Sequence, residues 1–515
     1  MARGEEEISY DREPPQKTAT TAITTVDPEL EETIFLPGEE GPLDREGQVG
    51  IGIFRFRFSL SSFRLGRGFS LRRFSIAEAA LLLMMAYISS RGLGVVRQTI
   101  FNAIFGTGPE ANAYYAAFQL PDTLFNLIAG GALIQAFVPV FVSYEKQHGQ
   151  AETWRLTSLV FNVMLVTLTA FLLVAEFLAP VFVNRLLVPG YSPSEQALTT
   201  SLTRIVLVQP LILGIGTIVT AILSSKRQFL LPALSMAIYN VGLIGGLLFT
   251  LAIPGIGIYG PTYGVLAAAV CQLLVQVPGL LKQRARYIFV WDIRHPGLQE
   301  VLRLLGPGAL SVAVVSVGFI IDTAFASYLS DQASLSALHN AQLLFALPVA
   351  LLAQAVAQAA LPRMSSLAVD GQFRRLRYLM LKVVGAAVLL SIPTAIVLGV
   401  LGKPMIHLLF QHGAFGQHSS YLTFLALVGY AVGLPGQVAG DLLARSFYSL
   451  KDARTPLFTN IFALLARFGL IVFLLKLLAG SSALIAIPLA ASGALTAEAV
   501  LLGLLLFLRL HAKIK

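Results

Sequence analysis

The stretch LTSLVFNVMLVTLTAFLLVAEFLAPVFV (156–183) is an apolar run with a single charged residue, Glu176. A helix of about 20 such residues crosses the roughly 30 Å hydrocarbon core of a bilayer. Similar runs recur from position 77 almost to the end of the 515-residue chain. The chain is 56% hydrophobic and 13% charged with a mean hydropathy of +0.73, whereas soluble proteins carry about 25% charged residues. These values exclude a soluble enzyme and predict an all-α polytopic membrane protein.

Apolar runs bounded by polar, Gly or Pro clusters predict twelve membrane spans. The spans are 78–104, 112–143, 156–183, 202–224, 231–253, 259–281, 298–327, 335–361, 378–402, 418–444, 457–478 and 483–508. Cytoplasmic loops should hold most Lys and Arg. With twelve spans, the loops and tail on one side carry 18 of these residues and the loops on the other side carry 3. This asymmetry predicts that both termini are cytoplasmic.

The first 76 residues differ in composition from the rest. Residues 1–50 contain 13 Asp and Glu against 4 Lys and Arg, and they are interpreted as a disordered acidic cytoplasmic tail. Residues 51–76 include FRFRFSLSSFRLGRGFSLRRF (54–74), a basic juxtamembrane segment. This segment either binds the anionic inner leaflet or serves only as a topology signal.

Two parts of the chain resemble each other. LP (120–121) precedes ALIQAFVP (132–139), and LP (347–348) precedes AVAQAALP (355–362), which lies 223 residues after the first copy. The copies end spans two and eight and therefore share one orientation, as in a parallel repeat. We therefore predict two six-helix lobes, 77–290 and 291–515, around a central cavity.

Arg91 and Arg97 stand in the first span, where an ionisable group usually faces a cavity or a partner. A bend at Gly92 and Gly94 would turn both guanidinium groups inward, where they would bind a diphosphate through bidentate hydrogen bonds. In the alternative, Arg97 extends to the outer interface and Arg91 pairs with a carboxylate such as Glu176.

The second half carries further charges within its spans, including Asp322, Asp441, Arg467 and Glu498. Asp322 and Arg467 could pair, and such a pair would be either structural or involved in ion coupling. Spacings such as Gly242-x-x-x-Gly246 favour close helix contact. No metal-ligand spacing, phosphate-binding loop or nucleophile motif is present, so neither a metal site nor catalysis is expected.

Several segments resemble one known family. They are SSRGLGVVRQTIFNAIFGTGPEANAYYAAFQLPDTLFNLIAGGALIQAFVPVFVSYEKQHG (89–149), IDTAFASYL (321–329), QAALPRMSSLA (358–368), LFQHGAF (409–415) and LLARSFYSLKDARTP (442–456). The chain resembles the MurJ/MviN lipid II flippases of the MOP exporter superfamily. The resemblance implies a MATE-like fold and transport of undecaprenyl-diphosphate-linked disaccharide pentapeptide from the inner to the outer leaflet, without a chemical step. It also implies that Arg91 and Arg97 line the headgroup cavity.

The chain departs from the family pattern at several positions. Asn112 replaces an Asp, Phe125 and Asn126 replace a basic pair, Gly130 replaces an acid and Leu343 replaces an Arg. The cavity is thus expected to be less charged, with Asn112, Gln119 and Asn126 offering neutral hydrogen bonds to the sugars. Some members have a sodium site in the second lobe. Asp322 matches one ligand there and Arg467 replaces another, so a tethered cation would stand in for the free one.

The leading hypothesis is a lipid II flippase of the bacterial cytoplasmic membrane that works by alternating access. Its partners would be the lipid-linked precursor and membrane lipids, with no nucleic acid. No cofactor is expected, and coupling to sodium, protons or the membrane potential stays open. The alternatives are a cation-coupled exporter of drugs or of another lipid-linked saccharide, and a transport-inactive membrane scaffold.

Overall fold

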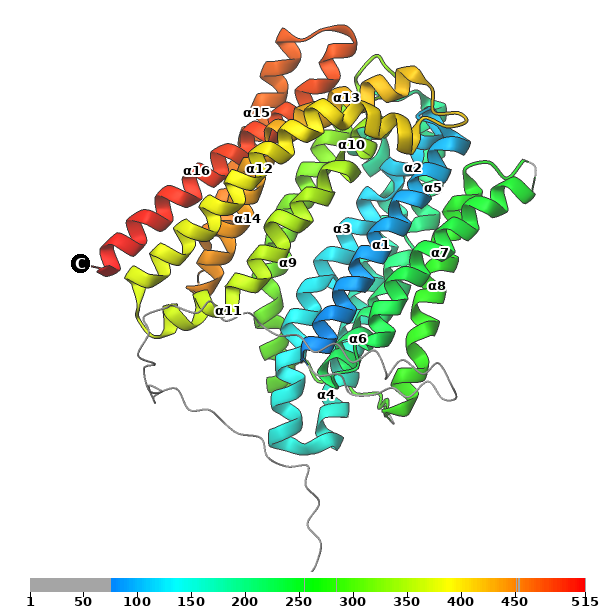
Figure 1. Ribbon diagram of the computed structural model, residues 1–515. Helices are drawn as coiled ribbons and strands as arrows, with labels where there is room; N and C mark the ends of the chain where they lie inside the picture. Colours follow the sequence, from blue (N-terminus) through cyan, green and yellow to red (C-terminus); the bar gives the residue numbers. More distant parts are fainter. Residues whose placement is uncertain (1–75, 254, 284, 451, 453, 515) are drawn as a thin grey trace, which may run out of the picture. The chain divides into compact units, whose positions relative to one another are not determined.

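The computed structural model describes residues 76–514 except 254, 284, 451 and 453, and this part of the chain contains helices and no strand. The predicted acidic tail and all but the last residue of the basic segment lie outside the described residues. The helices, shown in Figure 1, are α1 (Ile76–Phe105), α2 (Pro109–Ala117), α3 (Gln119–Ile128), α4 (Gly131–Phe182), η2 (Val183–Leu187), α5 (Pro193–Val206), α6 (Gln209–Ser225), α7 (Leu230–Ala252), α8 (Tyr259–Lys282), α9 (Pro296–Ser327), α10 (Ser334–Val349), η3 (Ala350–Ala355), α11 (Val356–Val369), α12 (Phe373–Phe410), α13 (Gln417–Val432), α14 (Leu434–Ser449), α15 (Arg454–Leu477), η4 (Gly480–Ile485) and α16 (Ala486–Ile514).

Within the described residues, nine helical runs are long and apolar enough to cross a membrane, or ten if the bent pair α13 and α14 forms one span. The number differs from the predicted twelve for two structural reasons. The run Pro109–Leu187 spans 79 residues and contains both the second and the third predicted span. Helix α1 covers the first predicted span but is not one of these nine or ten runs. The all-helical polytopic architecture is confirmed.

Helix α4 changes direction at Gly149, which has φ +79° and ψ 175°. A residue with a side chain rarely adopts a positive φ, so glycine is suited to this corner. Residues 131–148 therefore complete the second predicted span, and residues 150–182 form the third. The second span is further divided into α2, α3 and the first arm of α4.

Small residues bring helices into backbone contact, as the glycine spacing predicts. A Cβ atom on Gly246 of α7 would lie 2.5 Å from Cα of Gly264 in α8. In the second lobe, a Cβ atom on Gly433, between α13 and α14, would lie 2.6 Å from Cα of Ser492 in α16. Neither position can hold a larger residue without moving a neighbouring helix.

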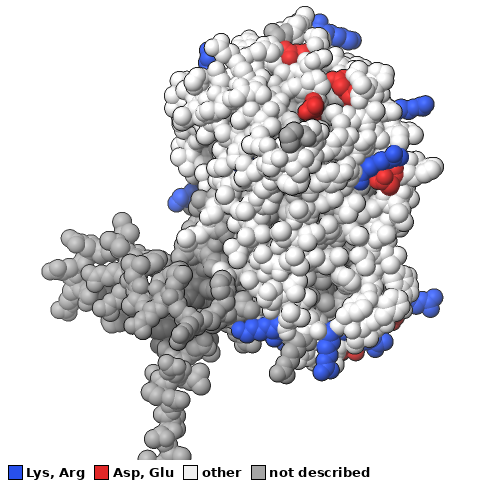
Figure 2. Space-filling model, turned by 90° about the vertical axis from the view of Figure 1, so that its right-hand side faces the viewer, with Lys and Arg blue, Asp and Glu red and all other residues white. Residues whose placement is uncertain are grey.

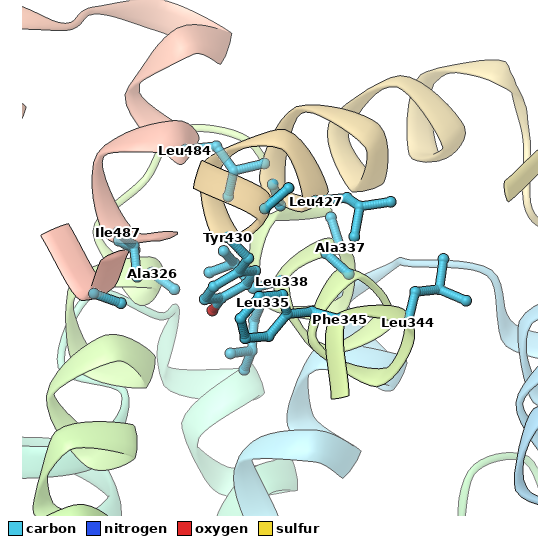
Figure 3. Packing of buried hydrophobic residues seen from close by; sticks show 14 of the residues in the cluster. Ala326, Leu335, Ala337, Leu338, Leu344, Phe345, Leu427, Tyr430, Leu484 and Ile487 are labelled. Atoms are coloured by element: carbon cyan, nitrogen blue, oxygen red, sulfur yellow. The ribbon is translucent and has the colours of Figure 1, made fainter. Parts of the chain in front are cut away.

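The largest group of buried apolar side chains lies mainly in the second lobe, where α10, α12, α13 and α16 meet. Figure 3 shows Phe345 of α10 beside Tyr430 of α13, and their ring centroids are 5.6 Å apart. Ala116 of α2 and Leu187 of η2 also belong to this group. The first lobe thus contributes side chains to the core of the second.

Helix α9 contacts α3 and α4 of the first lobe and α15 of the second. It therefore bridges the two predicted lobes, whose boundary near residue 290 stays a prediction. On the face shown in Figure 2, charged side chains lie at the lower end and at several places in the upper half, and a broad band between them is uncharged. Large apolar side chains such as Phe177 of α4, 82% exposed, suit a hydrocarbon environment.

Candidate functional site

Two adjoining cavities lie between helices of both predicted lobes. The first, about 240 Å³, is lined by residues of α1, α2, α3, α6, α7 and α10. The second, about 450 Å³, is lined by residues of α3, α9 and α10. Gln119, Asp122 and His339 line both cavities. Their combined size is in the range of small-molecule sites, so this region is the candidate substrate site.

Arg97 lines the first cavity together with Gln98, Tyr115 and Tyr239. Within the described part of the chain, no carboxylate lies within 4 Å of its guanidinium group. A partly buried arginine that lines a cavity can bind an anion there. Arg97 therefore lies at a cavity, where the first of the two predictions puts it.

Arg91 is exposed and is absent from the lining of both cavities. Helix α1 runs without a break from Ile76 to Phe105, including Gly92 and Gly94. Residues six positions apart on a helix point about 240° from each other. The structure therefore does not bring Arg91 and Arg97 together. The alternative partner of Arg91 is also wrong, because Glu176 pairs with Arg204 of α5 at 3.3 Å.

The three neutral residues predicted to contact sugars have different positions. Gln119 and Asn126 line the second cavity from α3. Asn112 is buried in α2, where its Oδ1 accepts hydrogen bonds from the backbone N–H of Ser336 (2.9 Å) and from the Ser336 hydroxyl (2.5 Å). Its Nδ2 donates to the carbonyl of Gln332. Asn112 thus links α2 to the first turn of α10 and does not line either cavity.

A buried amide network also joins the lobes beside the first cavity. The Nε2 of Gln98 donates to Oδ1 of Asn340 (2.8 Å), and the Nδ2 of Asn102 donates to the same oxygen (2.9 Å). Gln98 also contacts the Tyr115 hydroxyl at 2.5 Å. Because Gln98 and Asn102 lie on α1 and Asn340 lies on α10, these bonds hold the two lobes together.

Further contacts close the same end of the lobes, where α1 ends. The hydroxyls of Thr107 and Ser419 are 2.6 Å apart, and the N–H of Ala414 donates to the carbonyl of Ala103 (2.9 Å). Gly413 has φ +56°, and a Cβ atom there would lie 2.2 Å from the Ala103 oxygen. We call this end, defined by Gln98 to Asn112 and by the facing residues of the second lobe, the sealed end.

The predicted charges of the second lobe form a separate site. Asp322 of α9 and Arg467 of α15 make a buried ion pair, as predicted. Glu498 of α16 accepts a hydrogen bond from Thr459 (3.2 Å) and shares a cavity of about 80 Å³ with Arg467. Asp441 accepts from Gln437 instead (3.0 Å). In the described part of the chain, no group of three or more His, Cys, Asp or Glu residues is arranged to hold a metal ion.

Two cavity residues, Asp122 and His339, were not among the site residues predicted from the sequence. Asp122 is an acidic residue inside a predicted span, and the rule that drew attention to Glu176 and Asp322 applies equally to it. His339 stacks on Tyr115, with ring centroids 4.0 Å apart. Nothing in the local sequence around His339 distinguishes it from an ordinary packed histidine.

The helices of the described residues, with a polar cavity among them, have the fold of the MOP superfamily. A solved MATE multidrug transporter of that superfamily has a TM-score of 0.70 and covers 84% of this chain and 98% of its own, at 15% identity. The family model "Lipid II flippase MurJ" matches residues 101–514. The chain belongs to the lipid II flippase MurJ family.

Individual relatives agree with this assignment. The lipid II flippase MurJ of Burkholderia cenocepacia is 30% identical over 384 residues, which is 73% of this chain and 74% of that protein. The probable lipid II flippase MurJ of Rhizobium meliloti is 30% identical over 378 residues, 72% of this chain and 70% of that protein. A solved structure, "Lipid II flippase MurJ, inward closed conformation", has a TM-score of 0.70 at 25% identity and covers 82% of this chain and 86% of its own.

Proposed function

We propose that this protein moves a polyprenyl-diphosphate-linked cell-wall precursor, lipid II, from the inner to the outer leaflet of the bacterial cytoplasmic membrane. Both termini would lie in the cytoplasm. Membership of the MurJ family supports transport in place of catalysis. The observation that carries the proposal is the position of Arg97, an arginine without a carboxylate partner among the described residues, in the cavity between the lobes.

The role of Arg97 follows from the cost of bringing a diphosphate out of water. Unlike charges 4 Å apart attract by about 4 kcal/mol at an effective dielectric constant of 20. Arginine remains charged when desolvated and offers paired N–H donors to phosphate oxygens. Gln119 and Asn126 would donate neutral hydrogen bonds to the sugars from the neighbouring cavity.

Alternating access requires the lobes to separate at one end while they close at the other. The amide network at the sealed end supports this mechanism, because neutral hydrogen bonds between lobes contribute only about 1 kcal/mol each and can be exchanged for water. Transport would therefore proceed by rocking of the two lobes, with no covalent intermediate and no catalytic residue.

Coupling to an ion would involve the second-lobe charges. The guanidinium group of Arg467 already supplies a positive charge beside Asp322, and Glu498 shares a cavity with it. We expect transport to be independent of sodium. Equal initial rates in vesicles with a sodium gradient and with a potassium gradient of the same potential would support this expectation, whereas a sodium-specific rate increase would contradict it.

A leaflet-resolved assay of labelled lipid II in vesicles that contain the purified protein tests the proposal. The wild-type protein should expose labelled headgroup on the opposite leaflet, and Arg97→Ala should reduce the rate by at least tenfold while inserting normally. Glu176→Gln, which removes a charge outside both cavities, serves as the control. A wild-type rate equal to that of protein-free vesicles would refute lipid II transport.

One observation favours a second candidate, a cation-coupled exporter of drugs. Asp122 places a carboxylate in both cavities, and a carboxylate suits a lipophilic cation. Thermal stabilisation of the purified protein by tetraphenylphosphonium, with none by lipid II, would favour this candidate.

A further inference from the structure

Asp122 lies at the centre of a polar stripe on α3. Gln119, Asp122, Thr123 and Asn126 are spaced i, i+3, i+4 and i+7, so they share one helix face. All four line the second cavity, and Asp122 is exposed within it. The stripe is therefore a cavity wall made of hydrogen-bonding groups, and its carboxylate is available to a ligand.

No basic side chain neutralises this carboxylate. Among the described residues, no Lys, Arg or His nitrogen lies within 4 Å of Asp122. Arg97 lines the first cavity but is absent from the lining of the second, where Asp122 is the only Lys, Arg, Asp or Glu among the residues that the structure describes. The combined site therefore holds a positive group, Arg97, in the first cavity and a negative group, Asp122, where the two cavities adjoin.

This charge distribution constrains the headgroup that the site accepts. A diphosphate beside Asp122 would be repelled, because like charges at close range cost several kcal/mol in a site of reduced dielectric constant. An anionic group is therefore favoured only near Arg97. The Asp122 carboxylate favours a cationic group on the same molecule, and a primary ammonium supplies three donors for a carboxylate.

We propose that Asp122 binds a primary amine on the peptide of the lipid-linked precursor while Arg97 binds the diphosphate. The inference rests on the proposed function and adds to it the selection and orientation of the headgroup. The diphosphate lies toward α1 and α7, and the peptide amine lies between α3, α9 and α10. Gln119, Asp122 and His339 lie at the junction, since all three line both cavities.

Asp122 also has a simpler structural role that must be separated from amine binding. It stands in the first turn of α3, where a carboxylate interacts favourably with the helix dipole. Loss of this role would weaken the binding of all ligands equally, because the whole cavity wall formed by α3 would become less ordered. Loss of amine binding would lower the affinity only for ligands that carry a free amine.

The experiment measures binding of two forms of lipid II to the full-length protein in lipid nanodiscs. One form carries a lysine in its pentapeptide, and the other carries the same lysine with its ε-amine acetylated. The wild-type protein should bind the free-amine form about tenfold more tightly. Asp122→Asn should remove this preference and bind the acetylated form as the wild-type protein does, whereas Asp122→Glu should retain the preference. Glu176→Gln is the matched charge control and should behave like the wild-type protein.

Each outcome is decisive. Equal wild-type affinity for the two forms overturns the inference and leaves the proposed function standing, and this comparison needs no variant to fold. The inference is also overturned if Asp122→Asn still prefers the free-amine form, or if this variant loses affinity equally for both forms. If neither form binds the wild-type protein, the proposed function fails, and binding of tetraphenylphosphonium alone would overturn both.

Discussion

Asp322 of α9 and Arg467 of α15 form an ion pair that is almost completely shielded from solvent, with 10% and 15% of their side chains exposed. The second oxygen of Asp322 and the Nε of Arg467 have no hydrogen-bond partner among the described residues. Each charge therefore depends on the other, because an uncompensated buried charge is strongly destabilising.

This dependence predicts a non-additive stability effect. Arg467→Met should lower the free energy of unfolding by about 3 kcal/mol, and adding Asp322→Asn should recover a large part of that loss. Unfolding curves of the two single variants and the double variant in detergent provide the measurement. If the single effects simply add, the two side chains are not energetically coupled.

The amide network predicts control of the sealed end by Asn340. Asn340→Ala removes the acceptor of both Gln98 and Asn102, so the sealed end should open more often. The rate at which a maleimide modifies a cysteine at the buried Ser419 position, in a Cys271→Ser background, should rise about tenfold. A cysteine at Ser446, buried in α14, should stay unreactive. Equal acceleration at both positions would indicate global unfolding instead of opening.

The positions of the two first-span arginines predict unequal roles. Arg97→Ala should weaken lipid II binding by tenfold or more, because the cavity loses its anion-binding group. Arg91→Ala should change the dissociation constant by less than about threefold, since Arg91 is absent from the lining of both cavities. The comparison uses purified protein in nanodiscs. An equal loss of affinity in the two variants would instead support the prediction from the sequence that both arginines bind the diphosphate.

Asp452, in the connection between α14 and α15, predicts a pH effect outside the membrane-spanning segments. Burial opposes its ionisation, but hydrogen bonds from the N–H and hydroxyl of Thr455 and from Arg509 outweigh burial, so the pKa of Asp452 lies below its usual value of 3.8. A lowered pKa stabilises the folded state above the unfolded pKa, and this stabilisation disappears as pH falls through the folded value.

Asp452→Asn should therefore lower the melting temperature at pH 7, and its difference from the wild-type protein should shrink as pH falls below about 4. Melting temperatures measured from pH 7 to pH 3 test this expectation. Asp370→Asn, an exposed acid at the end of α11, is a control that should show a smaller difference at pH 7. A difference that grows toward low pH would contradict the assigned sign.

Much of the architecture could be predicted because membrane helices follow local rules. Runs such as 231–253 and 259–281 needed only length and apolar composition, and α7 and α8 occupy nearly those residues. The Asp322–Arg467 pair was also predictable, because two opposite charges at membrane depth in one lobe have few other partners. The predicted roles of Arg91 and Asn112 instead depended on side-chain direction, which residue type and depth do not define.

The sequence by itself determined that this chain is a helical membrane protein of the MurJ family, because hydropathy and motif identity are properties of residues in order along the chain. Only the tertiary structure decided that Arg97 faces the cavity without Arg91, that Asn112 closes the sealed end and that Asp122 lines the cavity wall. Those outcomes depend on the breaks between α2, α3 and α4 and on the docking of α10, which set the direction of each side chain through contacts between residues more than 200 positions apart.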